Sequence, residues 1–377
     1  MTVRQRWMWS ALALLLVMLV ALAPTALADG GTMTVVARGL NNPRGLDFGP
    51  SGLLYVAEAG MGGSGPCVPG PEGGQVCLGM SGSLSRIDLS RRVQERILTG
   101  LPSLAAPDGS AAIGPVDVSL FNEAQINVII GLGADPAARA QFGQNGRWLG
   151  RLLQGRAYKG FEATADVAAY EGVANPDGSQ PPDSNPYSVL AVPDKQIVAD
   201  AGGNDLLQVD AKGVITTLAI FPDRQVPAPP FLGMPPGATI PMQAVPTSVV
   251  QGPDGAYYVG QLTGFPFPVG AANVYRVPAG GGAPTVYASG FTNIVDIAFG
   301  KDGSLYVLEI AKAGLLAPGE GLPVGALIRV APNGTRTEIA SEGLLAPGGV
   351  TVGPDGALYV TNMSILPGAG EVLRIQP

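Results

Sequence analysis

The chain contains no histidine, and this absence excludes several kinds of site. A Ser-His-Asp triad, a histidine general base and a His-ligated zinc, copper or non-haem iron centre all need that side chain. Cysteine is almost absent as well, with two residues in 377. We therefore expect no haem and no His-ligated metal. Any catalysis would depend on carboxylates, Tyr, Lys, Ser, Thr or a hard cation bound by oxygen atoms.

Charge and long apolar segments are also scarce. Only 14% of the residues are charged and the net charge is −7, so nucleic acid and anionic lipid are poor partners. The one long apolar run, 7–23, follows Arg4 and Arg6 and precedes Ala26-Leu27-Ala28. This order predicts a secretory signal over residues 1–28 and one domain over residues 29–377, secreted or extracytoplasmic and free of the membrane after cleavage. An uncleaved membrane anchor is the alternative.

Helical periodicity is nearly absent, whereas 55 glycines and 35 prolines suit a chain with many tight turns. A phrase that combines a turn with a strand recurs instead. Its copies are GPSGLLYV at 49–56, GPDGAYYV at 252–259, GKDGSLYV at 300–307 and GPDGALYV at 353–360. Asp and Gly favour a tight turn, and Tyr and Val favour the strand that follows. Regular copies about 50 residues apart indicate a repeat architecture such as a β-propeller.

The chain divides into six units of four strands. Two units lack the phrase and fit less well; they begin near Gly114 and Tyr187, and the first of them ends in a strand over residues 165–170. The last unit reaches Pro377 after three strands, and residues 35–40 match the missing fourth strand. The sequence thus predicts an all-β fold, a six-bladed β-propeller whose ring is closed by the N-terminal strand completing the last blade.

Three segments depart from the repeat. Residues 60–81 contain Cys67 and Cys77, which we expect to form a disulfide in an exported protein; two free thiols or a metal pair are the alternatives. Residues 134–163 contain a cluster of five basic side chains that could bind an anionic ligand or simply form a solvated loop. Residues 221–245 are rich in proline and could cover the body or act as a linker.

Equivalent positions of all blades converge at the mouth of a propeller channel, so they are candidate sites. The starts of the innermost strands and the ends of the second strands are rich in carboxylate and amide oxygens. The candidate metal ligands are Glu58, Asp117, Asn185, Asp200, Asp296 and Glu309. Such a set suits Ca²⁺ or another oxygen-ligated divalent cation. Alternatively, a carboxylate could act as a general acid or base, or these side chains could only bind backbone groups.

Aromatic residues on proline-containing loops suggest contacts to a flat organic ligand. Together with two polar residues of the same rings, they give a set of candidate ligand contacts. These are Arg44, Tyr187, Gln261, Phe265 and Phe267. The alternative is that the aromatic rings only seal one loop against its neighbour.

Several non-repeat stretches are more specific than the propeller phrase. They are LNNPRGL at 40–46, GSGPC at 63–67, GLGADPA at 131–137, DSNPY at 183–187, ADAGGNDL at 199–206, VGQLTGFPFP at 259–268 and SGFTN at 289–293. In these stretches the chain resembles the ScyD/ScyE family, named for proteins encoded with the biosynthesis of scytonemin, an indole-phenol pigment. The resemblance implies an exported six-bladed propeller of the NHL/SMP-30-like kind, without assigning this chain to scytonemin chemistry. Relatives often carry His before the position of Asp117, where this chain has Val116.

These observations leave three functions open. The leading one is binding of a small aromatic or phenolic compound, with a divalent cation assisting an oxidative or coupling step. The second is a Ca²⁺-dependent lactonase-type hydrolase, which requires Glu, Asn and Asp around one point. The third is a non-catalytic interaction module at the cell surface, which requires exposed apolar patches on one rim. The sequence leaves open whether the protein is an enzyme.

Overall fold

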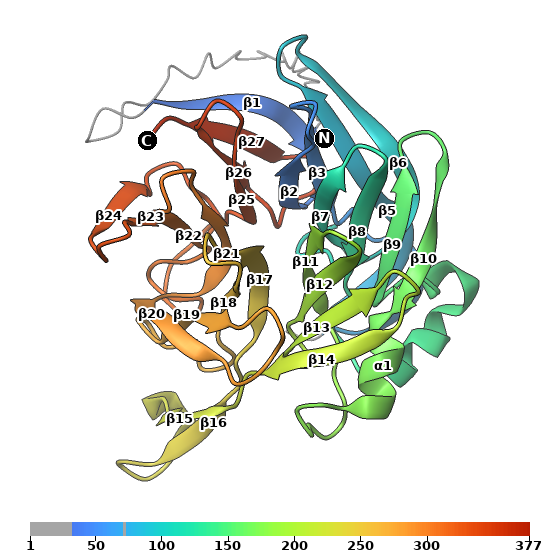
Figure 1. Ribbon diagram of the computed structural model, residues 1–377. Coiled ribbons are helices and arrows are strands. Elements are labelled where there is room, and N and C mark those ends of the chain that lie inside the picture. The colour runs from blue at the N-terminus through green and yellow to red at the C-terminus, as the bar shows by residue number, and fades with distance from the viewer. Residues whose placement is uncertain (1–31, 71–72) are drawn as a thin grey trace, which may run out of the picture.

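The computed structural model describes residues 32–70 and 73–377. Six antiparallel sheets surround a common axis, each with its first strand nearest that axis (Figure 1). The six-bladed β-propeller expected from the repeats is therefore confirmed. The predicted signal over residues 1–28 lies outside the described residues. Within those residues, no helix has the length and apolar character needed to cross a bilayer.

Each blade has four strands that follow one another from the axis outward. The first blade contains β2 (Pro43–Phe48), β3 (Leu54–Glu58), β5 (Gln75–Asp88) and β6 (Val93–Ala105). The second contains β7 (Pro115–Asn122), β8 (Gln125–Ile130), β9 (Arg151–Arg156) and β10 (Gly160–Asp166). The third contains β11 (Pro186–Val192), β12 (Lys195–Asp200), β13 (Asp205–Asp210) and β14 (Ile215–Ile220).

The other three blades follow the same order. The fourth contains β17 (Pro246–Gln251), β18 (Tyr257–Gln261), β19 (Ala272–Val277) and β20 (Thr285–Phe291). The fifth contains β21 (Ile294–Phe299), β22 (Leu305–Glu309), β23 (Ala326–Val330) and β24 (Arg336–Ala340). The sixth contains β25 (Gly349–Val352), β26 (Leu358–Asn362), β27 (Gly370–Ile375) and β1 (Met33–Leu40).

The last blade joins the two ends of the chain, as the sequence predicts. Strand β1 pairs antiparallel with β27, from Met33 opposite Ile375 to Leu40 opposite Gly370. An ion pair of 3.0 Å between Arg38 and Glu371 lies across the same two strands. This pairing satisfies the backbone groups of the outer edge of β27, which would otherwise be exposed.

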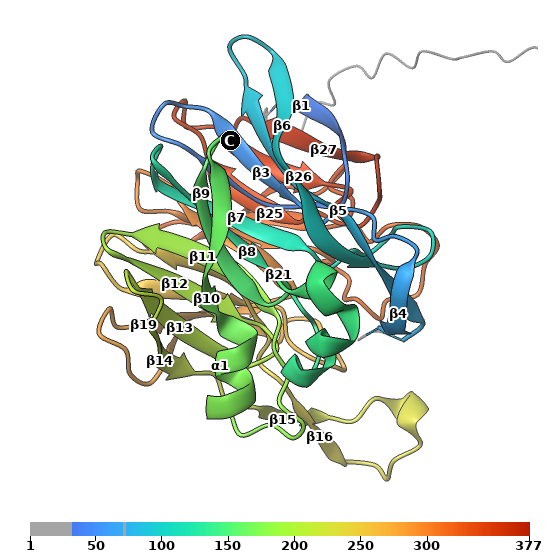
Figure 2. The same cartoon turned by 90° about the vertical axis from the view of Figure 1, so that its right-hand side faces the viewer.

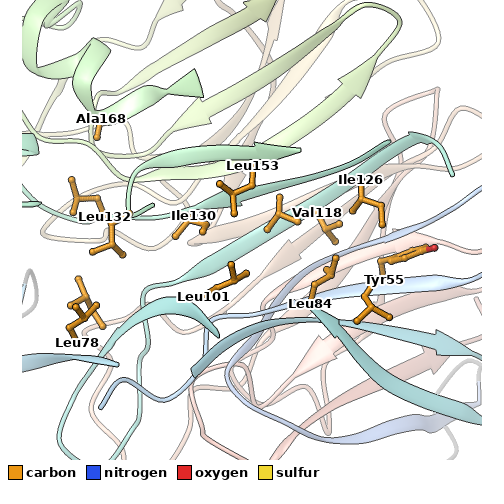
Figure 3. Packing of buried hydrophobic residues seen from close by; sticks show 14 of the residues in the cluster. Tyr55, Leu78, Leu84, Leu101, Val118, Ile126, Ile130, Leu132, Leu153 and Ala168 are labelled. Atoms are coloured by element: carbon orange, nitrogen blue, oxygen red, sulfur yellow. The ribbon is translucent and has the colours of Figure 1, made fainter. Parts of the chain in front are cut away.

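Adjacent blades pack face to face, and their alternating apolar residues form the core between them. Figure 3 shows this packing between the first and second blades. Leu84, Leu101, Val118 and Ile130 are all buried there. Full burial of each such side chain contributes about 1.5–3 kcal/mol. The core thus forms a ring around the axis, and the loops at the two ends of the blades carry the variable residues.

The repeated phrase has a structural role in each blade where it is complete. In the fourth blade, Asp254 of the turn accepts hydrogen bonds from the Ala256 amide at 3.2 Å and the Tyr258 hydroxyl at 3.3 Å. Its carboxylate also pairs with Arg276 on the third strand at 2.7 Å. The fifth and sixth blades repeat the turn-to-strand ion pair, as Asp302–Arg329 and Asp355–Arg374. The Asp of the turn and the Arg of the third strand therefore recur together because they bind each other.

The segment 60–81 forms an added hairpin on the first blade. Strand β4 (Gly65–Pro69) pairs with the beginning of β5, and Cys67 lies opposite Cys77. These two cysteines form the expected disulfide.

The segment 134–163 is more than a loop. It begins with the 3₁₀-helix η1 (Pro136–Gly146), whose N-cap is Asp135. It also supplies β9 and the beginning of β10, the two outer strands of the second blade. Residues 167–170, which we expected in a strand, lie instead in the helix α1 (Val167–Ala174), because the Asp166 side chain accepts a hydrogen bond from the Ala169 amide and caps a helix there.

The proline-rich segment 221–245 is an ordered hairpin. Strands β15 (Arg224–Pro227) and β16 (Thr239–Met242) pair with each other and flank the short 3₁₀-helix η2 (Pro230–Leu232). This two-stranded sheet projects away from the propeller body (Figure 2). Phe231 at its tip is 69% exposed.

Candidate functional site

Strand register shows which positions of the blades are equivalent. In five blades the last residue of the second strand lies opposite the first residue of the innermost strand. These pairs are Glu58–Pro43, Ile130–Pro115, Asp200–Pro186, Gln261–Pro246 and Glu309–Ile294. Arg44 is thus the second residue of its innermost strand, whereas Asp117 and Asp296 are the third and Asn185 precedes its strand. The candidates near the starts of the innermost strands therefore occupy three different strand positions, and they do not form one ring.

Residues at the ends of the second strands anchor the loops that lead into the innermost strands. Each of four such side chains accepts a hydrogen bond from a backbone amide of its loop. The pairs are Glu58 with Asn41 at 2.7 Å, Asp200 with Asn185 at 2.6 Å, Glu309 with Thr292 at 2.7 Å and Asn362 with Leu345 at 2.7 Å. Their common position is thus explained by the structure of the blade, which is one of the alternatives that the sequence leaves open.

Burial raises the pKa of two of these carboxyls. The pKa of Asp200 rises to about 6, although hydrogen bonds from Ser184 and from backbone amides oppose the shift. The pKa of Glu309 rises to about 7, and the Thr292 amide opposes that shift. Glu58 differs because Arg96 donates to both of its carboxylate oxygens, at 2.9 and 2.7 Å. Glu58 is therefore a buried partner in an ion pair that links β3 to β6.

Three aspartates of the innermost strands connect neighbouring blades. Each carboxylate accepts a hydrogen bond from a backbone amide of the next innermost strand. The pairs are Asp47 with Leu120 at 2.9 Å, Asp117 with Val189 at 2.8 Å and Asp296 with Val350 at 2.7 Å. Ser188 has the position of Asp117 and Asp296 in the third blade, and its hydroxyl accepts from the Val249 amide at 3.2 Å, whereas Asp47 lies further along its strand, opposite Tyr55. The role of this position is therefore to bind the next blade, and it does not require a charge.

These aspartates lie in a low-dielectric environment near the axis. Burial raises the pKa of Asp47 and of Asp117 to about 7, against the effect of their hydrogen bonds. Burial, followed by repulsion from Asp117, raises the pKa of Asp296 well above its usual range. The carboxyls of Asp47, Asp117 and Asp296 therefore stay protonated to a higher pH than an exposed aspartate does.

Arg44 and Tyr187 fill the space near the axis. Tyr187 lies on β11 of the third blade, yet it packs against an apolar cluster that includes Val295 and Val350 of the fifth and sixth blades. Burial raises the pKa of its hydroxyl, and the nearby Arg44 guanidinium opposes the shift. Arg44 is buried and donates to the Ala112 carbonyl at 2.8 Å. Both residues have a packing role, and ligand binding by them stays a prediction.

Phe265 and Phe267 lie together in the loop between β18 and β19. Their ring centroids are 6.4 Å apart, and Phe265 also contacts Phe231 of the projecting hairpin at 6.2 Å. Gln261 accepts a hydrogen bond from Arg224 at 3.2 Å. Phe265 is 43% exposed, so this loop seals against the hairpin and also presents an apolar surface.

The structure does not gather the six candidate metal ligands into one centre. Among residues 32–70 and 73–377, no three His, Cys, Asp or Glu side chains form a group that could hold a metal ion. Asp117 and Asp296 bind amides of the next blades, while Glu58, Asp200 and Glu309 bind their own loops. Asn185 accepts from the Leu132 amide at 3.3 Å. An ion bound by this set therefore stays a prediction.

A groove between the two insertions was not predicted. A cavity of about 280 Å³ lies between β5, β6 and η1, lined among others by Met80, Arg147, Trp148 and Phe161. A second cavity of about 510 Å³ follows the β4 hairpin and shares Met80 and Asn145 with the first. We refer to the two cavities together as the insertion groove. None of the predicted ligand contacts lines it. The basic cluster of residues 134–163 was the one sequence signal near it.

Only part of that basic cluster is available to a ligand. Arg139 and Arg151 each pair with Asp166 at 2.6 Å. Arg147 is exposed, and its guanidinium lies 5.0 Å from the centroid of the Trp148 ring. Aromatic and cationic groups are therefore adjacent in the insertion groove.

Comparisons with known proteins identify the fold and no more. No family model and no curated protein matches the chain. Similar solved structures include a streptogramin B lyase, with 12% identity, a TM-score of 0.50 and 92% of this chain and 98% of that chain covered. A glucose dehydrogenase has 14% identity, a TM-score of 0.51 and coverage of 92% and 99%. A protein of unknown function from Bacteroides thetaiotaomicron has 7% identity, a TM-score of 0.53 and coverage of 92% and 76%. At these identities the similarity establishes a shared propeller fold alone.

Proposed function

We propose that this protein binds a small aromatic compound with a negative charge in the insertion groove. The observation that carries the proposal is the meeting of two non-repeat segments, β4–β5 and η1, around two cavities that share Met80 and Asn145. Segments that depart from a repeated scaffold are where binding residues concentrate. The larger cavity, about 510 Å³, has the volume of a small-molecule site.

The lining of the groove explains this choice of ligand. Trp148 and Phe161 offer aromatic surfaces, and Met80 adds a polarisable apolar one that is 42% exposed. Arg147 supplies a positive charge with no acidic partner among the ion pairs of the described residues. An aromatic carboxylate or phenolate would contact both kinds of group at once.

This proposal retains the binding part of the leading sequence hypothesis and moves it to different residues. The oxidative or coupling step is not part of it, because no residue of the groove provides such chemistry. A lactonase reaction would need an oxygen-ligated ion, and among residues 32–70 and 73–377 no three acidic side chains form a group that could hold one. Export and the resemblance to the ScyD/ScyE family are compatible with the proposal and stay predictions.

Tryptophan fluorescence provides a direct test, because Trp148 is the only tryptophan after residue 28. In the full chain, Trp7→Phe and Trp9→Phe would leave Trp148 as the sole emitter. We expect 4-hydroxyphenylacetate to quench this emission saturably, with weaker quenching by the neutral 4-hydroxyphenylethanol and none by acetate. Absence of saturable quenching by any aromatic anion would contradict the proposal.

A matched pair of variants tests the role of charge. Arg147→Gln should weaken binding of 4-hydroxyphenylacetate about threefold, since an exposed ion pair contributes about 0.2–1 kcal/mol. It should leave binding of 4-hydroxyphenylethanol unchanged. Arg156→Gln, at an exposed position of the same insertion, is the control and should have no effect.

A second candidate function is docking of a partner protein on a group of exposed apolar side chains, which we call the apolar rim. Phe231, Phe265, Val269 and Leu316 are each at least 43% exposed, and Phe231 contacts Phe265. Exposed apolar patches of this kind favour the interaction-module hypothesis. Co-purification of partners from an extracytoplasmic extract, compared between the wild type and Phe231→Ser/Phe265→Ser, would test it. Recovery of the same partners by both proteins would contradict it.

A further inference from the structure

Five acidic side chains gather at one end of the third blade. Glu171 lies on α1, Asp177 and Asp183 lie in the loop from α1 to β11, and Asp200 and Asp205 flank the turn between β12 and β13. Asp200 and Asp205 lie directly opposite each other in the strand register. None of them takes part in an ion pair formed by the described residues. Like charges this close repel each other unless a cation or protons compensate.

Hydrogen bonds account for two members of the cluster. Asp200 accepts from the Ser184 hydroxyl at 2.6 Å and from the amides of Asn185, Gly202 and Gly203. Asp177 accepts from Ser179 and, at 2.9 Å, from the amide group of Asn204.

Glu171 and Asp205 have no such partners. They are 1% and 0% exposed, and none of their four carboxylate oxygens has a hydrogen-bond partner among the described residues. A buried carboxylate without a partner is strongly unfavourable, so these two side chains call for a ligand. Asn175 Oδ1 and Asp183 Oδ1 are buried without partners as well.

The β12–β13 turn passes close to the Glu171 carboxylate. A Cβ atom added to Gly203 would lie 2.9 Å from Glu171 Oε2 and 3.5 Å from Asp200 Cγ. Glycine therefore keeps the backbone of the β12–β13 turn clear of the Glu171 carboxylate. The Gly203 amide is directed to Asp200, which fixes the turn beside the cluster.

We propose that Glu171 and Asp205 bind a hard divalent cation, for which Ca²⁺ is the best match, with Asn175 as a neutral oxygen ligand. Ca²⁺ takes six to eight oxygen ligands in flexible geometry, including amide oxygens and water. The two carboxylates would supply the charged ligands, and Asn175 Oδ1 and water would supply neutral ones. One shared proton is the competing explanation, but it would satisfy only part of the four oxygens.

Such an ion would hold three segments together. Asn204 lies in the β12–β13 turn beside the cluster and donates to Asp177. Its side-chain oxygen accepts from the Val245 amide at 3.0 Å, and its carbonyl accepts from the Phe221 amide at 2.8 Å. The cation site thus connects the α1 loop and the β12–β13 turn to the base of the projecting hairpin. It shares no residue with the insertion groove, so either site can exist without the other.

Calorimetric and thermal titration of the full chain with CaCl₂, after removal of metal by EDTA, tests the proposal. At a Ca²⁺ concentration 100 times the dissociation constant, we expect the thermal midpoint to rise by about 4 °C. Mg²⁺ should give a smaller rise because it demands strict octahedral geometry. No binding heat and no rise with Ca²⁺, Mg²⁺ or Mn²⁺ would overturn the proposal.

Three variants assign the ion to this site. Glu171→Gln alone should weaken Ca²⁺ binding at least tenfold, and Glu171→Gln/Asp205→Asn should abolish it. Ca²⁺ should raise the thermal midpoint of the wild type and leave that of the double variant unchanged; a purely structural role of the two acids would give no such difference. Glu162→Gln, at an exposed acidic position on β10, is the control and should bind as the wild type does. Ca²⁺ binding that survives in the double variant would place the ion elsewhere and refute the assignment.

Discussion

Ionisation of the axial aspartates should make the propeller less stable as the pH rises. Asp117 is the clearest case, because burial raises its pKa from 3.8 to about 7. The folded protein therefore keeps a proton on Asp117 over an interval in which the unfolded chain has released it. The stabilisation is fully present below about pH 4 and is lost as the pH rises to about 7.

The size of this effect follows from the shift. Raising the pKa of one carboxyl from 3.8 to about 7 corresponds to about 4 kcal/mol. Asp117 is half-buried and retains contact with water, which reduces the expected value to about 2–3 kcal/mol. Between pH 4.5 and pH 7.5, Asp117 should account for about 2 kcal/mol of lost stability.

The protein itself suggests the variant for the test. Ser188 has the position of Asp117 in the next blade, and its hydroxyl also accepts an amide hydrogen bond from the following strand. Asp117→Ser therefore keeps an acceptor for the Val189 amide and removes the titrating group. The free energy of unfolding, from urea titrations at pH 4.5 and pH 7.5, should fall about 2 kcal/mol less in this variant than in the wild type. Asp223→Ser, at an exposed aspartate, is the control; equal pH dependence in all three proteins would refute the reasoning.

Three further substitutions test the scaffold by urea unfolding. Gly45→Ala should lower the free energy of unfolding by about 3 kcal/mol, since the added methyl would overlap the carboxylate of Asp117; an unchanged midpoint would show that the innermost strands can separate. Cys67→Ser/Cys77→Ser should lower it by about 2–3 kcal/mol under non-reducing conditions, and a reductant should reproduce the loss in the wild type only. Glu58→Gln should lower it by about 2 kcal/mol because its guanidinium partner loses the charge it pairs with; a neutral effect would mean that the ion pair is replaceable.

The fold could be predicted because its main signals are local and repeated. The turn residues of the phrase fix a hairpin in each blade, and the incomplete last unit requires the N-terminal strand. The second blade was harder, since it lacks the phrase and its outer strands lie inside what reads as an insertion. Asp166 begins a helix at residues that also suit a strand, and local sequence alone does not decide between them.

The candidate site was predicted less well, because the repeats indicate where a residue lies in its blade but not what its side chain does there. The repeats correctly locate Glu58, Asp200 and Glu309 at one level of the blades, but that level anchors loops. Function needs groups that the scaffold does not already use. Trp148 and Glu171 meet this condition, and both lie in segments outside the repeat, where equivalent positions do not exist to be compared.

What distinguishes a candidate functional residue from a structural one is therefore whether its side chain already has partners within the scaffold. Asp117 is half-buried and Asp200 is fully buried, and each has several donors, so their burial is already compensated. Glu171 and Asp205 are 1% and 0% exposed and have no donors, and nothing in the blade structure compensates them. Sequence distinguishes these two classes poorly, because a donor can come from a residue more than 70 positions away, as the Val189 amide does for Asp117. The proposed cation site therefore follows from unsatisfied side chains at one end of the third blade and not from the acidic residues near the axis.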